Sequence, residues 1–193
     1  LELFGPSLVG LRLFSGLALG AAILLAGLMA RELGGGRFAQ LTAAAAVAIA
    51  PIVIVQGGMF QYVALDYFWW VLIAFLSIRL LASGDRRWWL AIGAAIGLGM
   101  LTKYTLGLLV IGLVLGVLLT PSRRDLLTPW PYAGAGVALL IWLPNLLWQL
   151  QHDFVSLEFL GAMLARDVAI GRSDGFLPEQ LFVSASPITL PLW

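Results

Sequence analysis

Long apolar runs, separated by short segments that carry arginine, are the feature that most limits what this 193-residue chain can fold into. Hydrophobic residues make up 61% of the sequence and the mean hydropathy is +0.99, which is typical of a membrane protein. Backbone amides in lipid must be bonded within the chain, and the period-two alternation of barrel strands is missing. We therefore expect an all-α, polytopic membrane helix bundle.

The apolar runs predict six membrane spans and the beginning of a seventh, because a spanning helix needs about 20 apolar residues. We place them at 8–30, 39–57, 63–82, 88–102, 104–120 and 131–149, with the seventh from about 180. The region 88–119 as one helix would be about 48 Å long, which exceeds a hydrocarbon core of about 30 Å. We therefore divide this region at Lys103.

The basic residues are distributed unequally between the two sides that this division creates. One side collects seven of the 11 lysines and arginines: Arg31, Arg37, Arg79, Arg86, Arg87, Arg123 and Arg124. The other side has four: Arg12, Lys103, Arg166 and Arg172. By the positive-inside rule the first side is cytoplasmic, and the second faces outward.

Several kinds of site are disfavoured by composition. The chain has no cysteine, which excludes disulfides and thiolate metal sites. Its net charge is only +1 and its basic residues are spread over the loops, so nothing indicates nucleic-acid binding. A divalent metal stays possible because carboxylates are plentiful on the outward side, although no ligand spacing supports one and no cofactor is certain.

Two ionisable residues interrupt apolar helix ends on the outward side. Asp66 opens the third predicted span, and Lys103 occupies the turn between the fourth and the fifth. Ionisable groups at membrane depth are costly and commonly functional, so both are candidate site residues. Asp66 can instead be a helix N-cap or an interface residue, and Lys103 can extend its ammonium to the headgroups without binding a substrate.

Four further residues are candidates for substrate binding on the same side. Arg12 lies one turn inside the first span, where a guanidinium needs an anionic partner and suits a phosphate or carboxylate. His152 and Asp153 follow the sixth span, and Arg166 lies in the long segment beyond it. His152 is more simply a solvated loop residue, because the chain has no second histidine to complete a zinc site.

An acid, a lysine and arginines at a lipid–water boundary suit the transfer of a sugar from a lipid phosphate. The departing phosphate gains negative charge that fixed cations stabilise, and the attacking hydroxyl needs a carboxylate base. We therefore expect a glycosyltransferase in which Asp66 is catalytic. An ion-coupled transporter that uses Asp66 and Lys103 as a pair is the alternative, and a non-catalytic membrane scaffold is not contradicted.

Five segments resemble, in order, the membrane proteins of bacterial glycosyltransferase family 39. They are 60–70, 86–89, 97–104, 143–149 and 152–157, and the likeness covers nearly all of residues 5–193. Each segment is short and apolar, so the specificity lies in their order and spacing. The family includes protein O-mannosyltransferases and lipid A aminoarabinose transferases, and the resemblance implies a GT-C fold.

The resemblance also implies an activity. Family members transfer a sugar, with inversion, from a polyprenyl phosphate to an acceptor hydroxyl or phosphate at the periplasmic face of the bacterial inner membrane. Asp66 matches a family acid near the active site, Lys103 a residue near the lipid phosphate, and Arg12 an arginine that faces the catalytic loop. The bilayer and the lipid-linked donor are the implied partners, whereas the sugar and the acceptor are not specified.

Two departures from the family pattern affect these expectations. The main catalytic acid of the family lies in a loop that would precede Leu1. Some relatives also carry an acid three positions before the one matched to Asp66, where this chain has Val63. We expect residues 1–193 to be an interior part of one transmembrane glycosyltransferase domain, without its first span, that span's catalytic loop and its C-terminal region.

Overall fold

The computed structural model describes residues 8–57 and 61–171, and within these ranges the chain is helical and contains no strand. The elements are α1 (Leu8–Glu32), α2 (Arg37–Ala48), α3 (Pro51–Gly57), α4 (Tyr62–Ser83), α5 (Trp88–Thr102), α6 (Leu106–Leu119), the 3-10 helix η1 (Pro121–Leu127), α7 (Trp130–Gln151) and α8 (Val155–Ala169). The expectation of an all-α fold is confirmed.

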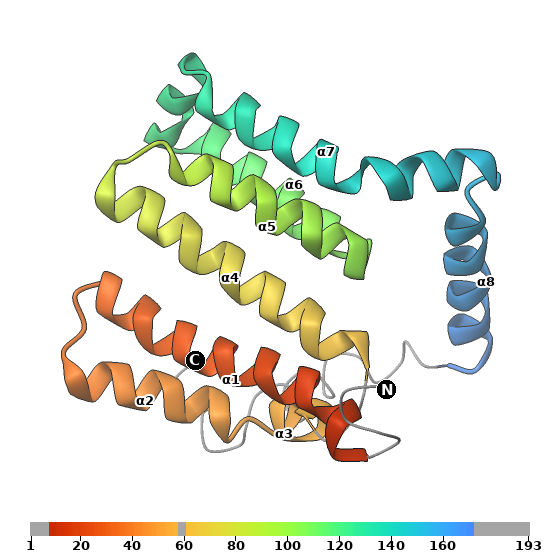
Figure 1. Cartoon of the computed structure of the whole chain (residues 1–193), viewed down its shortest axis with the longest axis horizontal. Helices are drawn as coiled ribbons and strands as arrows, with labels where there is room; N and C mark the ends of the chain where they lie inside the picture. Colours follow the sequence, from red (N-terminus) through yellow and green to blue (C-terminus); the bar gives the residue numbers. More distant parts are fainter. Residues whose placement is uncertain (1–7, 58–60, 172–193) are drawn as a thin grey trace.

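Four helices lie side by side in the order α1, α4, α5, α7, as Figure 1 shows. Helix α2 packs against α1 at one edge, and α6 lies beside α5. The main core is formed by α4, α5 and α6, where Ile73, Ile92 and Leu106 are almost completely buried. A smaller cluster of Leu19, Val53 and Ala64 joins the middle of α1, α3 and the beginning of α4.

Within the described residues, fewer helices than the sequence predicts have the length and apolar composition of a membrane span. Three helices are long and apolar enough to cross a membrane, Arg12–Glu32, Tyr62–Ser83 and Trp130–Gln151. A fourth arises if α6 and η1, which are bent by 98°, count as one span. The predicted count of six to seven is therefore not confirmed, and the predicted span from about 180 lies outside the described residues.

The predicted span 39–57 is divided into two short helices. Helix α2 ends at Ala48 and α3 begins at Pro51. Proline has no backbone N–H to continue the preceding helix and restricts the residue before it, so Pro51 is favoured as the first residue of a new one. The Ala50 carbonyl then accepts hydrogen bonds from the amides of Val53 and Ile54.

Helices α5 and α7 are in direct backbone contact because glycines face each other between them. A Cβ atom added at Gly93 would collide with the carbonyl oxygen of Gly134, and one added at Gly134 would collide with the carbonyl oxygen of Trp89. Gly97 also lies close to α7, since its Cβ would be 2.8 Å from the Ala138 oxygen. Small residues allow this close approach inside a membrane.

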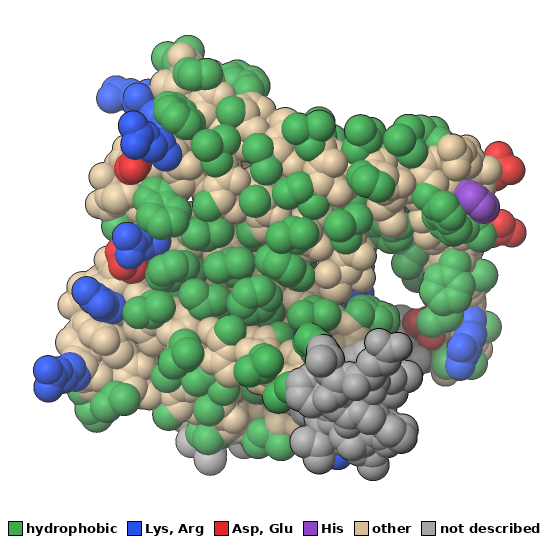
Figure 2. All heavy atoms as spheres, viewed as in Figure 1, with side chains coloured by type: hydrophobic (Ala, Val, Ile, Leu, Met, Phe, Trp, Pro, Cys, Tyr) green, Lys and Arg blue, Asp and Glu red, His purple; other side chains and the backbone are tan. Residues whose placement is uncertain are grey.

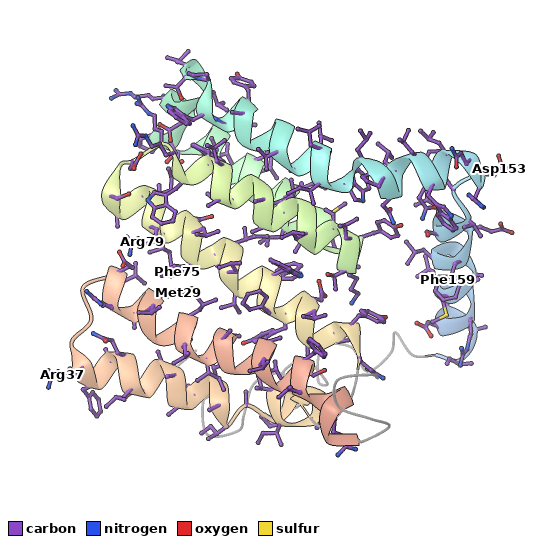
Figure 3. All side chains as sticks on the ribbon, viewed as in Figure 1. Met29, Arg37, Phe75, Arg79, Asp153 and Phe159 are labelled. Atoms are coloured by element: carbon purple, nitrogen blue, oxygen red, sulfur yellow. The ribbon has the colours of Figure 1, made fainter. Side chains whose placement is uncertain are left out.

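Basic side chains gather at one end of the bundle, as Figure 2 shows, over the α1–α2 and α4–α5 connections and η1. Two ion pairs link the elements there: Arg79 to Glu32 at 3.0 Å, and Arg86 to Asp125 at 2.9 Å. Figure 3 shows Arg37 and Arg79 at this end and Asp153 at the opposite end. We call the two ends the basic end and the Lys103 end.

Candidate active site

Asp66 and Lys103 form an ion pair at the Lys103 end. The ammonium nitrogen of Lys103 lies 3.6 Å from Asp66 Oδ2. This separation is too long for a hydrogen bond of good geometry, so the ammonium keeps its donors for another group. Asp66 is 8% exposed, and its Oδ1 is buried with no hydrogen-bond partner among the described residues. Both charged groups therefore retain unused bonding capacity.

Asp66 is held by helix α4 one turn beyond its beginning. The N-cap of α4 is Gln61, which excludes the N-cap interpretation of Asp66. Asp66 is also buried, which does not fit the other alternative, an interface residue whose carboxylate reaches water. A buried carboxylate requires a cationic or hydrogen-bonding partner, and Lys103 supplies the charge.

The Lys103 turn is recessed because α5 is short. With 15 residues, α5 is about 22 Å long, whereas the 22 residues of α7 span about 33 Å. Helix α7 accordingly extends past the end of α5 in Figure 1. Lys103 is the C-cap of α5 in an extended conformation, and its carbonyl accepts a bond from the Leu106 amide that starts α6. The chain thus reverses before it reaches the level of the α7 end.

Side chains of α4 hold the turn in place. Trp69 Nε1 donates a 3.1 Å hydrogen bond to the Thr102 hydroxyl. Gly99 makes room for this contact, because a Cβ there would lie 2.5 Å from Leu106 Cδ2 and 3.1 Å from Trp69 Cβ. The Lys103 ammonium also lies 5.8 Å from the centre of the Tyr62 ring, within the range of a cation–π contact.

Arg12 shares this end of the bundle without a partner in the described residues. Helices α1 and α4 both begin at this end of the bundle in Figure 1. The Arg12 side chain is exposed and makes no hydrogen bond or ion pair with a described side chain. Its guanidinium is therefore free to bind an anion.

The other three predicted residues lie at the corner between α7 and α8 and are exposed. The His152 ring stacks on Trp148 with centres 4.2 Å apart, and its Nδ1 donates a 2.8 Å bond to the Trp148 carbonyl. Asp153 has a positive φ of 51°. Arg166 lies in the last turn of α8. The structure shows no contact of these residues with Asp66 or Lys103.

Helix α8 occupies part of the long segment beyond the sixth predicted span, for which the sequence predicts no helix. It runs across the Lys103 end at an angle to α7, and Figure 2 shows an opening between it and the bundle. Most of its residues are exposed, including Leu157, Phe159 and Leu164. Arg172, which the sequence also placed on this side, lies outside the described residues.

The sequence assigns no site role to three polar residues that lie near Lys103: Tyr104, Asn145 and Gln149. The Tyr104 hydroxyl donates a 2.9 Å bond to Asn145 Oδ1 and accepts a 2.6 Å bond from Gln149 Nε2. Gln149 is 5% exposed. The side-chain amides of Asn145 and Gln149 lie in an otherwise apolar span, and buried amides need hydrogen-bond partners. This pattern in the sequence therefore indicates a polar contact with another helix.

An apolar groove of about 660 Å³ lies among α5, α6 and α7. Met100 and Gly107 line it near the Lys103 turn, and Leu126 and Tyr132 line it near the basic end. The groove therefore runs along the bundle. Within residues 8–57 and 61–171, no three side chains of metal-binding type gather at one place.

Comparison with known proteins agrees with this membrane-embedded arrangement. Residues 1–148 match the protein family described as dolichyl-phosphate-mannose-protein mannosyltransferase. The chain is also similar to the lipid A galacturonosyltransferase RgtD of Rhizobium johnstonii, with 39% identity over 89 residues. That alignment covers 43% of this chain and 19% of the relative's own length. No solved structure matches the chain.

Proposed function

This chain belongs to the dolichyl-phosphate-mannose-protein mannosyltransferase family, and from that premise we propose that it transfers a sugar from a polyprenyl-phosphate donor to an acceptor hydroxyl or phosphate. We place the reaction at the periplasmic face of a bacterial inner membrane, with inversion at the anomeric carbon. The described helices then belong to one transmembrane glycosyltransferase domain.

The observation that carries this proposal is the Asp66–Lys103 pair. A lysine in a recess near a membrane surface, with donors not satisfied by its carboxylate, suits the phosphate of a lipid-linked sugar. The carboxylate beside it has a buried oxygen with no hydrogen-bond partner within residues 8–57 and 61–171, and this oxygen can accept the hydrogen bond of a hydroxyl. Arg12, at the same end, supplies a second cation for the phosphate.

The chemistry follows from these positions. The acceptor oxygen forms a bond to the anomeric carbon while the bond from that carbon to the phosphate oxygen breaks. The electron pair of the broken bond goes to the phosphate, where Lys103 and Arg12 stabilise the added charge. The proton of the acceptor hydroxyl goes to a carboxylate, and Asp66 Oδ1 is the one we assign within the described chain.

The apolar groove supports a lipid-linked donor. It begins beside the Lys103 turn and is lined almost wholly by apolar groups. A polyprenyl chain that entered it would place its phosphate at the level of Lys103. An ion-coupled transporter is not favoured, because the family is one of sugar transfer and the polar residues gather at one end of the bundle rather than at its centre.

The corner residues are proposed to contact the acceptor. His152, Asp153 and Arg166 are exposed on or just before α8, which Figure 2 shows across an opening from the bundle, and a polar acceptor would approach this side from water. The similar Rhizobium protein is named for transfer to lipid A, so a lipid A acceptor is the first to test. A protein or another envelope glycan is the second.

A transfer assay tests this function directly. Membranes from cells with and without the complete gene are incubated with radiolabelled polyprenyl-phosphate sugars, including a galacturonic acid and a mannose donor, and with each acceptor class. We expect gene-dependent incorporation of label into one acceptor from one donor. Equal incorporation in both membranes, for every donor and acceptor, would contradict the proposal.

A further inference from the structure

Three consecutive residues of the Lys103 turn each contact a different partner. Thr102 accepts a hydrogen bond from Trp69 of α4, and Lys103 pairs with Asp66 of the same helix. Tyr104 points the other way and bonds to α7. The turn is therefore fastened between the two helices, and Tyr104 is its sole hydrogen-bonded side-chain link to α7 within the described residues.

The Tyr104 hydroxyl uses its bonding capacity on α7. It donates to Asn145 Oδ1 at 2.9 Å and accepts from Gln149 Nε2 at 2.6 Å. Asn145 and Gln149 lie four residues apart, so they occupy the same face of the helix. Pro144 precedes Asn145 inside α7. Both amides thus face the Lys103 turn.

Gln149 extends the same connection to α8. Its Nε2 donates a second bond, of 2.6 Å, to the Ser156 hydroxyl, and its backbone carbonyl accepts bonds from the amides of His152 and Phe154. Asp153 and Phe154 both have positive φ, a conformation that non-glycine residues adopt at some cost. Gln149 therefore stabilises the strained corner from which α8 departs.

We propose that Tyr104 and Gln149 are positioning residues, which fix the Lys103 ammonium relative to α7 and α8 so that it meets the donor phosphate. This inference rests on the proposed sugar transfer. Tyr104 is adjacent in sequence to Lys103, and its hydroxyl touches neither donor nor acceptor in the proposed arrangement. Loss of this hydroxyl would shift the Lys103 ammonium. A displacement of about 1 Å at a reacting centre can lower the rate by as much as about a hundredfold.

Kinetic constants separate this role from a merely structural one. A variant that folds less well contains fewer active molecules, so its apparent kcat falls while both KM values stay unchanged. A variant with a displaced Lys103 binds the donor phosphate less well. Its donor KM rises while its acceptor KM does not, because the acceptor residues we propose lie elsewhere.

The experiment uses Tyr104→Phe and Gln149→Met in the protein expressed from its complete gene, with a polyprenyl-phosphate sugar as donor. We expect about a tenfold rise in donor KM for each variant. Acceptor KM should stay within about twofold of wild type in Tyr104→Phe, whereas Gln149→Met also loses the bond to Ser156 at the corner and should raise acceptor KM as well. Gln40→Met is the matched control for Gln149→Met, because Gln40 Nε2 donates one 3.0 Å bond to the Gly35 carbonyl at the basic end. Its donor KM should equal that of wild type.

Two failures are distinguishable. An unchanged donor KM in both Tyr104→Phe and Gln149→Met, in a protein whose wild type transfers sugar, would overturn the positioning role and leave the proposed function intact. Absence of transfer by the wild type would overturn the proposed function and this inference together.

Discussion

Replacing Lys103 with alanine, or Asp66 with asparagine, is expected to lower sugar transfer about a hundredfold or more, because each change removes a group that acts on developing charge. Lys103→Ala removes the ammonium that we assign to the departing phosphate. Asp66→Asn removes the carboxylate that we assign to the acceptor proton and leaves the ammonium without its partner. Initial rates at saturating donor, normalised to the amount of folded protein, measure the effect.

Glu32→Gln provides the matched control for these variants. It breaks the 3.0 Å ion pair between Arg79 and Glu32, which also joins two helices but lies at the basic end. Both partners of this pair are partly exposed, so little stability should be lost. Transfer should stay within about twofold of wild type. If Glu32→Gln and Lys103→Ala reduced transfer equally, the Asp66–Lys103 pair would have no special role.

The second large effect is expected from the contact between α5 and α7. Gly134→Ala would press a methyl group against the Trp89 carbonyl oxygen, and Gly93→Ala would do the same against the Gly134 carbonyl oxygen. Carbonyl groups of packed helices cannot move aside as side chains do, so the helices must separate. We expect each variant to lose about 1–3 kcal/mol of unfolding free energy, measured by denaturant titration in detergent.

Gly136→Ala is the control in the same helix. A Cβ at Gly136 meets no atom within 4 Å, so the added methyl group should be tolerated. Alanine is also the better helix former, by about 1 kcal/mol in water. Equal destabilisation by Gly134→Ala and Gly136→Ala would show that the two backbones are not in contact.

Helix positions followed well from the sequence where an apolar run ended at a polar or basic residue. The predicted limits 88–102 coincide with α5, and 63–82 and 131–149 differ from α4 and α7 by one or two residues. Division of 88–119 at Lys103 is confirmed, since α5 ends at Thr102 and α6 begins at Leu106. The same reasoning failed at 39–57, where Pro51 begins a separate helix.

The partners of each helix could not be predicted. A helix that is apolar on every face has no polar side to show which face is buried. The rotation of α4 that buries Asp66 could therefore not be predicted from the order of its apolar and polar residues. The bonds of Tyr104 to Asn145 and Gln149 join residues more than 40 positions apart. Such contacts depend on how the helices are rotated and packed.

The charge asymmetry was the most informative feature of the sequence. Arginines predicted to share one face gather at the basic end in Figure 2, where Arg79 and Arg86 pair with Glu32 and Asp125. Asp66 and Lys103, predicted to share the other face, are in contact there. Their roles in sugar transfer stay predictions.

Cysteine labelling across the membrane tests the central claim most directly, since the chain has no natural cysteine. Single cysteines at Lys103 and Asp153 should react with a membrane-impermeant maleimide added to cells whose outer membrane is opened. Cysteines at Arg37 and Arg123 should react only after the inner membrane is also opened. Labelling of positions 103 and 123 from the same side would contradict the account, because the Asp66–Lys103 pair would then not face outward.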